Sequence, residues 1–188
     1  KGCDIVYHCA ALAYEGLSVF SPHVVTHNIV SASASIFSAA ISNRVKRIVY
    51  CSSMARYGST HTPFHEGWNF PQPRDPYGIA KLAAEDILRS LCETHGIEYV
   101  IAVPHNIIGP RQKYDDPYRN VASIMINRCK QGKPPIVYGD GLQTRCFSPA
   151  NDCLPSIVKA VEGKADGEII NIGPDQGEIT VLELANMI

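Results

Sequence analysis

The chain has 188 residues, of which 45% are hydrophobic and 19% charged, and its 17 lysines and arginines nearly balance 18 aspartates and glutamates for a net charge of −1. This length suits one globular domain with a sizeable core, and a near-neutral chain without a basic stripe excludes nucleic acid as an expected partner. No uninterrupted apolar run reaches the roughly 18 residues of a membrane helix, so no membrane partner is expected.

Short β-rich apolar runs alternate with longer helical patterns, which is typical of βαβ units and of a parallel sheet. Three strands are expected, at 5–7, 47–51 and 99–103. Two long helices, at about 22–42 and 76–94, should lie between them, because each pattern opens with a proline in the first helical position. We therefore expect an α/β fold with a parallel sheet.

Beyond residue 104 proline and glycine become frequent, which predicts a smaller, loop-rich region. In chain order it should contain a helix at 119–131, a strand at 136–138, a helix at 152–162, a strand at 168–172 and the start of a helix at 180–188.

The seven cysteines include no Cys-x-x-Cys pair and several lie in apolar runs, so buried, reduced thiols are expected. No metal site is expected, because the pairs His23/His27 and His61/His65 have no second pair of ligands. The first residues lack the charged and apolar regions of a signal peptide, so a cytoplasmic location is expected.

The stretch with the most chemical information is Pro76-Tyr77-Gly78-Ile79-Ala80-Lys81. Tyr77 and Lys81 are four residues apart, so they share a helix face, and a nearby ammonium can lower a tyrosine pKa from about 10 towards neutrality. Ser53 follows a strand, at the sheet edge where open α/β sheets place their ligands. The alternative is an exposed amphipathic pair, but the placement after a strand and a serine pair favours a general acid–base site.

At these residues the chain resembles the extended short-chain dehydrogenase/reductase superfamily, in its nucleotide-sugar epimerase and dehydratase branch. The resemblance covers nearly the whole chain and also rests on four other ordered motifs. These are His8-Cys9-Ala10-Ala11, Ser53-Met54-Ala55-Arg56-Tyr57-Gly58, Asn106-Ile107-Ile108-Gly109-Pro110-Arg111 and Asp140-Gly141-Leu142-Gln143-Thr144-Arg145-Cys146-Phe147.

The resemblance implies a Rossmann-like parallel sheet with helices on both faces, a small mixed α/β substrate-binding region, and NAD as cofactor. It implies a catalytic triad in which Ser53 and Tyr77 contact the reacting sugar hydroxyl. Tyr77 takes its proton while hydride passes to the nicotinamide, and Lys81 holds the nicotinamide ribose and lowers the tyrosine pKa.

The resemblance also implies two sets of binding residues. Those expected at the cofactor, besides Tyr77 and Lys81, are Cys9, Ala10, Ala11, His27 and His105. Those expected at the nucleotide-sugar substrate, in addition to Ser53, are Asn106 and Asn120 at the diphosphate, Tyr138 at the base and Arg145 at the diphosphate, where a planar fork of donors suits paired anionic oxygens.

None of the 14 glycines forms the phosphate-binding loop of a dinucleotide site, so the resemblance implies an internal fragment. Residues 1–104 would be the carboxyl part of the NAD-binding domain, and 105–188 mainly the substrate region, incomplete at its end. A UDP-sugar is the expected substrate. Family members commonly dimerise through the two long helices, which here would be 22–42 and 76–94, so a homodimer is expected.

The chain departs from the dehydratases and decarboxylases of this branch, which carry an acidic residue just after the catalytic serine or threonine. Met54 and Ala55 stand there, so elimination lacks its proton carrier and C4 epimerisation of a UDP-hexose through a transient ketone is favoured. A one-way NAD(P)-dependent reductase or dehydrogenase and a catalytically silent NAD-binding regulatory relative remain alternatives. Arg56 replaces a small apolar residue and should either reach a charged substrate or face solvent.

Overall fold

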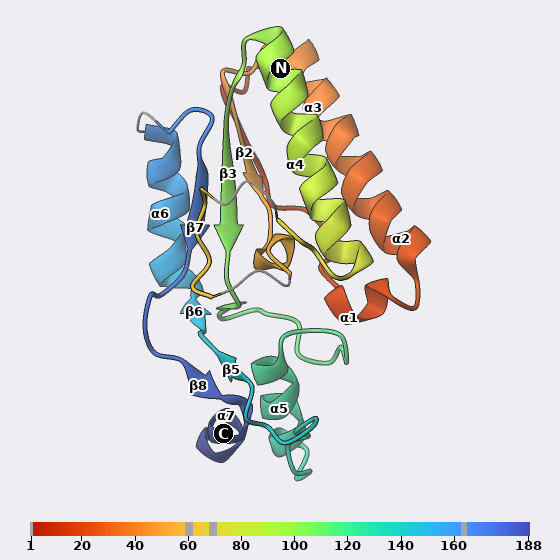
Figure 1. The fold of residues 1–188 in the computed structure, drawn as a ribbon, viewed down its shortest axis with the longest axis vertical. Coiled ribbons are helices and arrows are strands. Elements are labelled where there is room, and N and C mark those ends of the chain that lie inside the picture. The colour runs from red at the N-terminus through yellow and green to blue at the C-terminus, as the bar shows by residue number, and fades with distance from the viewer. Residues whose placement is uncertain (1, 59–61, 68–70, 163–164) are drawn as a thin grey trace. The chain divides into compact units, whose positions relative to one another are not determined.

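A computed structural model describes residues 2–58, 62–67, 71–162 and 165–188 (Figure 1). The chain forms two compact units. The first comprises the residues up to Pro104 together with Ser156–Ile172, and the second comprises His105–Pro155 and Gly173–Ile188. His61, one of the histidines considered as a metal ligand, lies outside the described residues.

The first unit is built on a four-stranded parallel sheet in the order β1-β2-β3-β7. Strands β2 and β3 are almost wholly buried, as expected for the interior of a sheet covered on both faces. The three strands expected in this part of the chain are confirmed. The bounds are β1 Ile5–His8, β2 Arg47–Cys51, β3 Glu98–Pro104 and β7 Ile169–Ile172.

Helices α3 (Ala32–Ser42) and α4 (Pro76–His95) lie on one side of this sheet, and α6 (Ala150–Glu162) lies on the other (Figure 1). Asp75 caps α4 by accepting a 2.8 Å hydrogen bond from the Gly78 amide, and Gly96 ends the helix with φ 65°. The α/β fold class is confirmed.

The helix expected from residue 22 to 42 forms, but it contains a π-helical stretch that was not predicted. The order is α2 (Pro22–Thr26), η1 (His27–Ser31) and α3, preceded by the short α1 (Glu15–Ser18). An 18-residue window of the helix Pro22–Ser42 has a mean hydropathy of 1.4, enough by length and composition to cross a membrane, which the sequence prediction did not recognise. Core helices meet the same criterion, and this one buries Val25 and Phe37 beside α4.

The homodimer through these helices stays a prediction.

The second unit is smaller and is held by two pairs of two-residue strands. Strands β4 (Ile107–Ile108) and β6 (Ser148–Pro149) pair in parallel, and β5 (Thr144–Arg145) and β8 (Ile179–Thr180) pair antiparallel. Helices α5 (Val121–Lys130) and α7 (Val181–Met187) share a small apolar cluster. The expected helices in this part of the chain are confirmed, whereas the strand expected at 136–138 is wrong, because the backbone there has no strand pairing.

One boundary between the units lies after Pro104, and the roles predicted for residues 1–104 and 105–188 stay predictions. Residues Ser156–Ile172 belong with the first unit, because β7 pairs with β3 and completes the parallel sheet.

Candidate active site

Ser53 directly follows the buried serine at the carboxyl end of β2 and begins the 3-10 turn η2 (Met54–Arg56). Its hydroxyl oxygen accepts a 3.2 Å hydrogen bond from the amide of Ala55, which fixes the side chain at the start of the turn. The side chain of Ser53 lies close enough to Tyr77, in the first turn of α4, to lower the pKa of its phenol. The structure therefore brings the expected serine and tyrosine together.

The contact between α4 and η2 depends on a glycine. A Cβ atom on Gly78 would lie 2.7 Å from the carbonyl oxygen of Ala55, closer than real Cβ contacts. Gly78 therefore allows the first turn of α4 to approach η2 closely enough for Tyr77 to reach Ser53.

Lys81 lies one helical turn after Tyr77 and is almost completely buried, with 3% of its surface exposed. Its Nζ donates a 2.8 Å hydrogen bond to the carbonyl oxygen of Cys51 and lies 6.0 Å from the centre of the Tyr77 ring. Burial lowers the Lys81 pKa to about 8, partly opposed by the charges of Cys51, Glu85 and Cys9. The ammonium is therefore held at the end of β2, on the same helix face as Tyr77.

The expected lowering of the Tyr77 pKa by Lys81 is wrong for the protein without ligands. Burial raises the Tyr77 pKa, the hydrogen bond from Ser53 partly opposes this, and the charges of Glu15 and Asp75 raise it further. These causes favour the protonated phenol.

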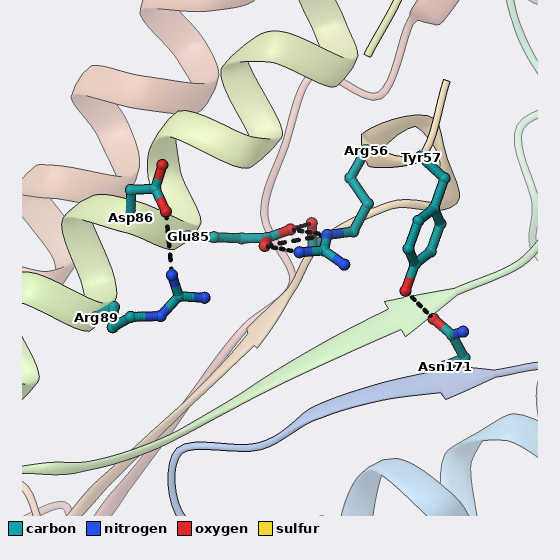
Figure 2. A network of polar contacts seen from close by, with 7 residues as sticks. Arg56, Tyr57, Glu85, Asp86, Arg89 and Asn171 are labelled. Atoms are coloured by element: carbon teal, nitrogen blue, oxygen red, sulfur yellow. Dashed lines mark hydrogen bonds and ion pairs between the residues drawn. The ribbon is translucent and has the colours of Figure 1, made fainter. Parts of the chain in front are cut away.

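Arg56 does not face solvent, which corrects that expectation, and a contact with the substrate stays a prediction. It is 2% exposed and forms a bidentate pair with the fully buried Glu85 of α4, with Nη2 and Oε2 3.0 Å apart (Figure 2). The hydroxyl of Ser52 donates a hydrogen bond to the same carboxylate. Burial raises the Glu85 pKa, and Arg56 opposes this most strongly. This network joins α4 to Ser52, which precedes Ser53, and to Arg56, the last residue of η2.

Tyr57, next to Arg56, is fixed from the opposite direction. Its hydroxyl donates a 2.8 Å hydrogen bond to Oδ1 of Asn171 on β7 (Figure 2). Its ring stacks on Phe64, with the ring centres 4.8 Å apart. The turn that carries Ser53 is therefore anchored to α4 and to β7 by buried side chains.

The residues expected along the cofactor follow the carboxyl end of β1. Cys9 and Ala10 are exposed, whereas Ala11 is half-buried against the core. The Cys9 thiol lies 3.3 Å from the thiol of Cys51. All seven cysteines are free, but the expectation that they are buried holds for only three, because Cys3 and Cys9 are exposed and Cys129 and Cys146 are half-buried. The buried ones are Cys51, Cys92 and Cys153.

His27 lies in η1 with its side chain exposed and its ring 6.0 Å from the ring of His23. No interaction in the described part of the chain links it to Ser53, Tyr77 or Lys81. Its cofactor role stays a prediction.

In the second unit, three of the expected residues lie together. The Asn106 amide nitrogen is 3.1 Å from Nε2 of His105 and 3.1 Å from the carbonyl oxygen of Cys146. Burial lowers the His105 pKa and the neighbouring charge of Arg145 lowers it further. Arg145 itself is exposed on β5 and donates to the carbonyl oxygen of Thr144. The Asn106 amide nitrogen thus already has two partners within the chain, and the exposed Arg145 guanidinium is the neighbouring donor that suits an anion.

The two remaining substrate residues of this unit are placed separately. Asn120 caps α5, where its Oδ1 accepts a 3.0 Å hydrogen bond from Ala122, so the side chain already has a structural role. Tyr138 is 77% exposed in a loop.

No group of three His, Cys, Asp or Glu side chains within the described ranges is arranged to hold a metal ion. A hollow of about 390 Å³ lies at the amino end of β3, lined in part by Cys92, Tyr99 and Asp166. It contains none of the expected site residues, which gather at the opposite, carboxyl ends of the strands in this unit.

Sequence reasoning missed the roles of Glu85 and of the Cys51 carbonyl. The signal for Glu85 was present, because Tyr77, Lys81 and Glu85 repeat every four residues and must share one helix face. The Cys51 carbonyl carries no sequence signal.

Residues 1–173 match the model of a family described as the NAD-dependent epimerase/dehydratase family. UDP-N-acetyl-alpha-D-glucosaminuronate decarboxylase of Bacillus cytotoxicus is 31% identical over 187 residues, covering 97% of this chain and 57% of the relative. The chain thus spans a little over half the length of such a relative.

Two solved structures are similar along nearly the whole chain. UDP-N-acetylglucosamine 4-epimerase from Methanobrevibacter ruminantium, in complex with UDP-N-acetylmuramic acid, has a TM-score of 0.90 at 33% identity, covering 98% of this chain and 59% of that one. UDP-glucuronic acid 4-epimerase from Bacillus cereus, in complex with UDP-glucuronic acid and NAD, has a TM-score of 0.85 at 29% identity, covering 95% and 56%.

Proposed function

The chain belongs to the NAD-dependent epimerase/dehydratase family, and from this membership we propose that the protein epimerises a nucleotide-diphospho-sugar, with a UDP-hexose at C4 as the expected case. The observation that carries the proposal is the arrangement of Ser53, Tyr77 and Lys81 beside two residues, Met54 and Ala55, that have no acidic group.

NAD fits the donor set at the carboxyl ends of β1 and β2. Lys81 and Tyr77 offer an ammonium and a hydroxyl from one face of α4, and Ala10 presents only a methyl group on exposed backbone. When bound, NAD supplies the hydride acceptor and donor and adds positive charge to the site. These residues account for the nicotinamide and ribose half of the cofactor.

In this proposal Tyr77 moves the proton of the reacting sugar hydroxyl, and Ser53 orients that hydroxyl through a hydrogen bond. Lys81 stays protonated, binds ribose and keeps positive charge near the phenol. The same Tyr77 returns the proton after the ketone has turned over, so one residue serves both directions.

Met54 and Ala55 pack partly buried against the core, so neither can remove or donate a proton. Dehydration needs such a group to expel water from the neighbouring carbon. Of the two carboxylates whose charge reaches Tyr77, Asp75 is engaged in capping α4, and Glu15 is exposed on α1. Epimerisation needs no proton carrier beyond Tyr77.

The UDP-sugar assignment is supported by the two neighbouring structures, whose proteins are 4-epimerases of UDP-sugars. Asn106 and Arg145 are the donors proposed for the diphosphate.

The test is product analysis by NMR after incubation of the intact protein, because these 188 residues alone are expected to be inactive, with NAD and UDP-glucose or UDP-N-acetylglucosamine. The proposal expects the C4 epimer from wild type and from Glu15→Gln, and loss of product with Tyr77→Phe. A 4-keto-6-deoxy sugar would identify a dehydratase instead, and net consumption of added NAD(P)H would identify a reductase.

A further inference from the structure

Cys9 and Cys51 are neighbours on adjacent parallel strands. The register pairs His8 with Tyr50, so the next residues, Cys9 and Cys51, lie side by side and their thiols point to the same side of the sheet. Neighbouring strands are about 4.8 Å apart, which lies within the range of about 4.4–6.8 Å between the Cα atoms of disulfide-bonded cysteines.

The two thiols differ in exposure. Cys9 is exposed, whereas Cys51 is 9% exposed at the end of the buried strand β2. The sulfur atoms are 3.3 Å apart, so a bond of about 2.05 Å needs them to approach by only a little more than 1 Å. An oxidant from solvent would therefore meet Cys9 first, and Cys51 is already in place to react with the product.

From this geometry we propose that Cys9 and Cys51 form an oxidation site, at which a peroxide converts the two thiols into a disulfide next to Lys81. The Cys9 thiolate attacks one peroxide oxygen, an S–O bond forms, the O–O bond breaks, and water leaves after protonation. Cys51 then attacks the sulfenic sulfur of Cys9, the S–O bond breaks, and the hydroxyl leaves as water with the Cys51 proton. Each sulfur is oxidised by one electron and the peroxide is reduced to two waters.

The electrostatics of the pair agree with this order of events. The hydrogen bond from Cys51 lowers the Cys9 pKa to about 6, and the nearby Lys81 lowers it further, although burial opposes both. The Cys51 pKa is raised, first by its hydrogen bond with Cys9 and then by burial. Cys9 is therefore the attacking thiolate and Cys51 the resolving thiol.

The disulfide would act on Lys81 in two ways. Lys81 donates its hydrogen bond to the carbonyl of Cys51, whose position the new bond constrains. Oxidation also removes the negative charge that the thiols place near the ammonium and that raises the Lys81 pKa. Both effects weaken the residue proposed to hold the ribose, so oxidation should reduce NAD binding.

The test treats wild-type protein without NAD with hydrogen peroxide and maps the peptides by mass spectrometry without reduction. The expected result is a cross-linked pair of peptides that contain Cys9 and Cys51. Its mass should be lower by two hydrogen atoms than the sum of the two separate peptides, and dithiothreitol should restore the separate peptides. In Cys51→Ser, Cys9 should instead stop at the sulfenic acid and be trapped by dimedone. Cys92→Ser changes a buried thiol on α4, away from the pair. This variant is the matched control and should still form the Cys9–Cys51 cross-link.

Absence of the Cys9–Cys51 peptide in wild type, with Cys9 and Cys3 oxidised to the same extent, would overturn the inference, and this readout does not depend on the folding of any variant. Oxidation is then repeated with NAD present. A cross-link that forms equally fast with and without NAD would leave the oxidation site supported and would count against the proposed cofactor site, so the two proposals can fail separately.

Discussion

Arg56 and Glu85 form a bidentate ion pair that is buried on both sides, and one residue further along α4 Asp86 forms an exposed pair with Arg89 at 3.3 Å (Figure 2). The first pair connects the turn that follows Ser53 to α4, whereas both residues of the second pair lie within a single turn of α4. The two pairs use the same chemistry in different surroundings, which makes them a natural comparison.

Glu85→Gln should destabilise the protein by about 3–5 kcal/mol, because it leaves the Arg56 charge buried without a counter-charge. Asp86→Asn, in the exposed pair, should cost at most about 1 kcal/mol. Urea unfolding of both variants measures the difference. Equal losses would contradict the view that the buried network holds η2, and Arg56→Met/Glu85→Leu should recover part of the loss.

The close approach of α4 to η2 gives a second prediction. Gly78→Ala should force the two elements apart, destabilise the fold by about 1–3 kcal/mol and reduce activity, because Tyr77 would no longer meet Ser53. Gly67→Ala is the control, since a Cβ atom there meets nothing within 4 Å. The thermal midpoint and turnover of each variant provide the measurement. If Gly78→Ala behaved like Gly67→Ala in both, the proposed contact would be wrong.

Because the pKa of Lys81 is lowered, alkaline pH should have opposite effects on activity and on stability. Its pKa falls from 10.5 to about 8 on folding, so between these values the unfolded state binds more protons and the Lys81 contribution to stability rises with pH. Activity that needs the ammonium should instead fall above about pH 8. In the Lys81→Arg variant the arginine keeps its charge throughout this range. The kcat/KM that this variant retains should therefore not decline near pH 8. An unchanged alkaline limb in Lys81→Arg would assign the decline to another group.

The buried His8 should make the stability of the fold sensitive to acid. It is 3% exposed and its Nε2 is 2.9 Å from the Ser33 hydroxyl. Burial, assisted by the charge of Lys81, lowers its pKa from 6.5 to about 4. Between these pH values the unfolded state binds more protons than the folded state. The free energy of unfolding should therefore fall by about 3 kcal/mol in total as the pH falls from 6.5 towards 4. His8→Gln should flatten this dependence in urea unfolding, whereas His95→Gln, at an exposed site, should not. A slope that survives in His8→Gln would exclude this residue as its cause.

The sheet and the long helices could be predicted because their signals are local. The apolar runs at β2 and β3 and the cap formed by Asp75 and Pro76 lie within a few residues of the elements that they define. The two-residue strands of the second unit are too short to show any periodicity, and η1 continues a helical pattern without marking its wider turns.

The error at residues 136–138 has a physical explanation. The three apolar residues resemble a strand, but Tyr138 is exposed while Val137 packs on the apolar cluster of α5 and α7, so the segment needs no strand partner. Local pattern alone cannot distinguish these arrangements.

Within the site, Tyr77 and Lys81 were predictable from their spacing on one helix. The partner of Arg56 was not, because Glu85 is 29 residues away and only the packing of α4 against η2 brings them together. The raised pKa of Tyr77 was missed for the same reason, since its main cause is burial.

In the proposed mechanism one hydride leaves the sugar carbon and returns to the same carbon, while Tyr77 moves the proton. It is tested most directly with UDP-glucose deuterated at C4 and the protein loaded with NAD. The C4 epimer should keep its deuterium at C4, no deuterium should appear in solvent, and Tyr77→Phe should slow this conversion by about 10²–10⁴-fold. An epimer that has lost its deuterium to water, or one formed equally fast by Tyr77→Phe, would contradict it.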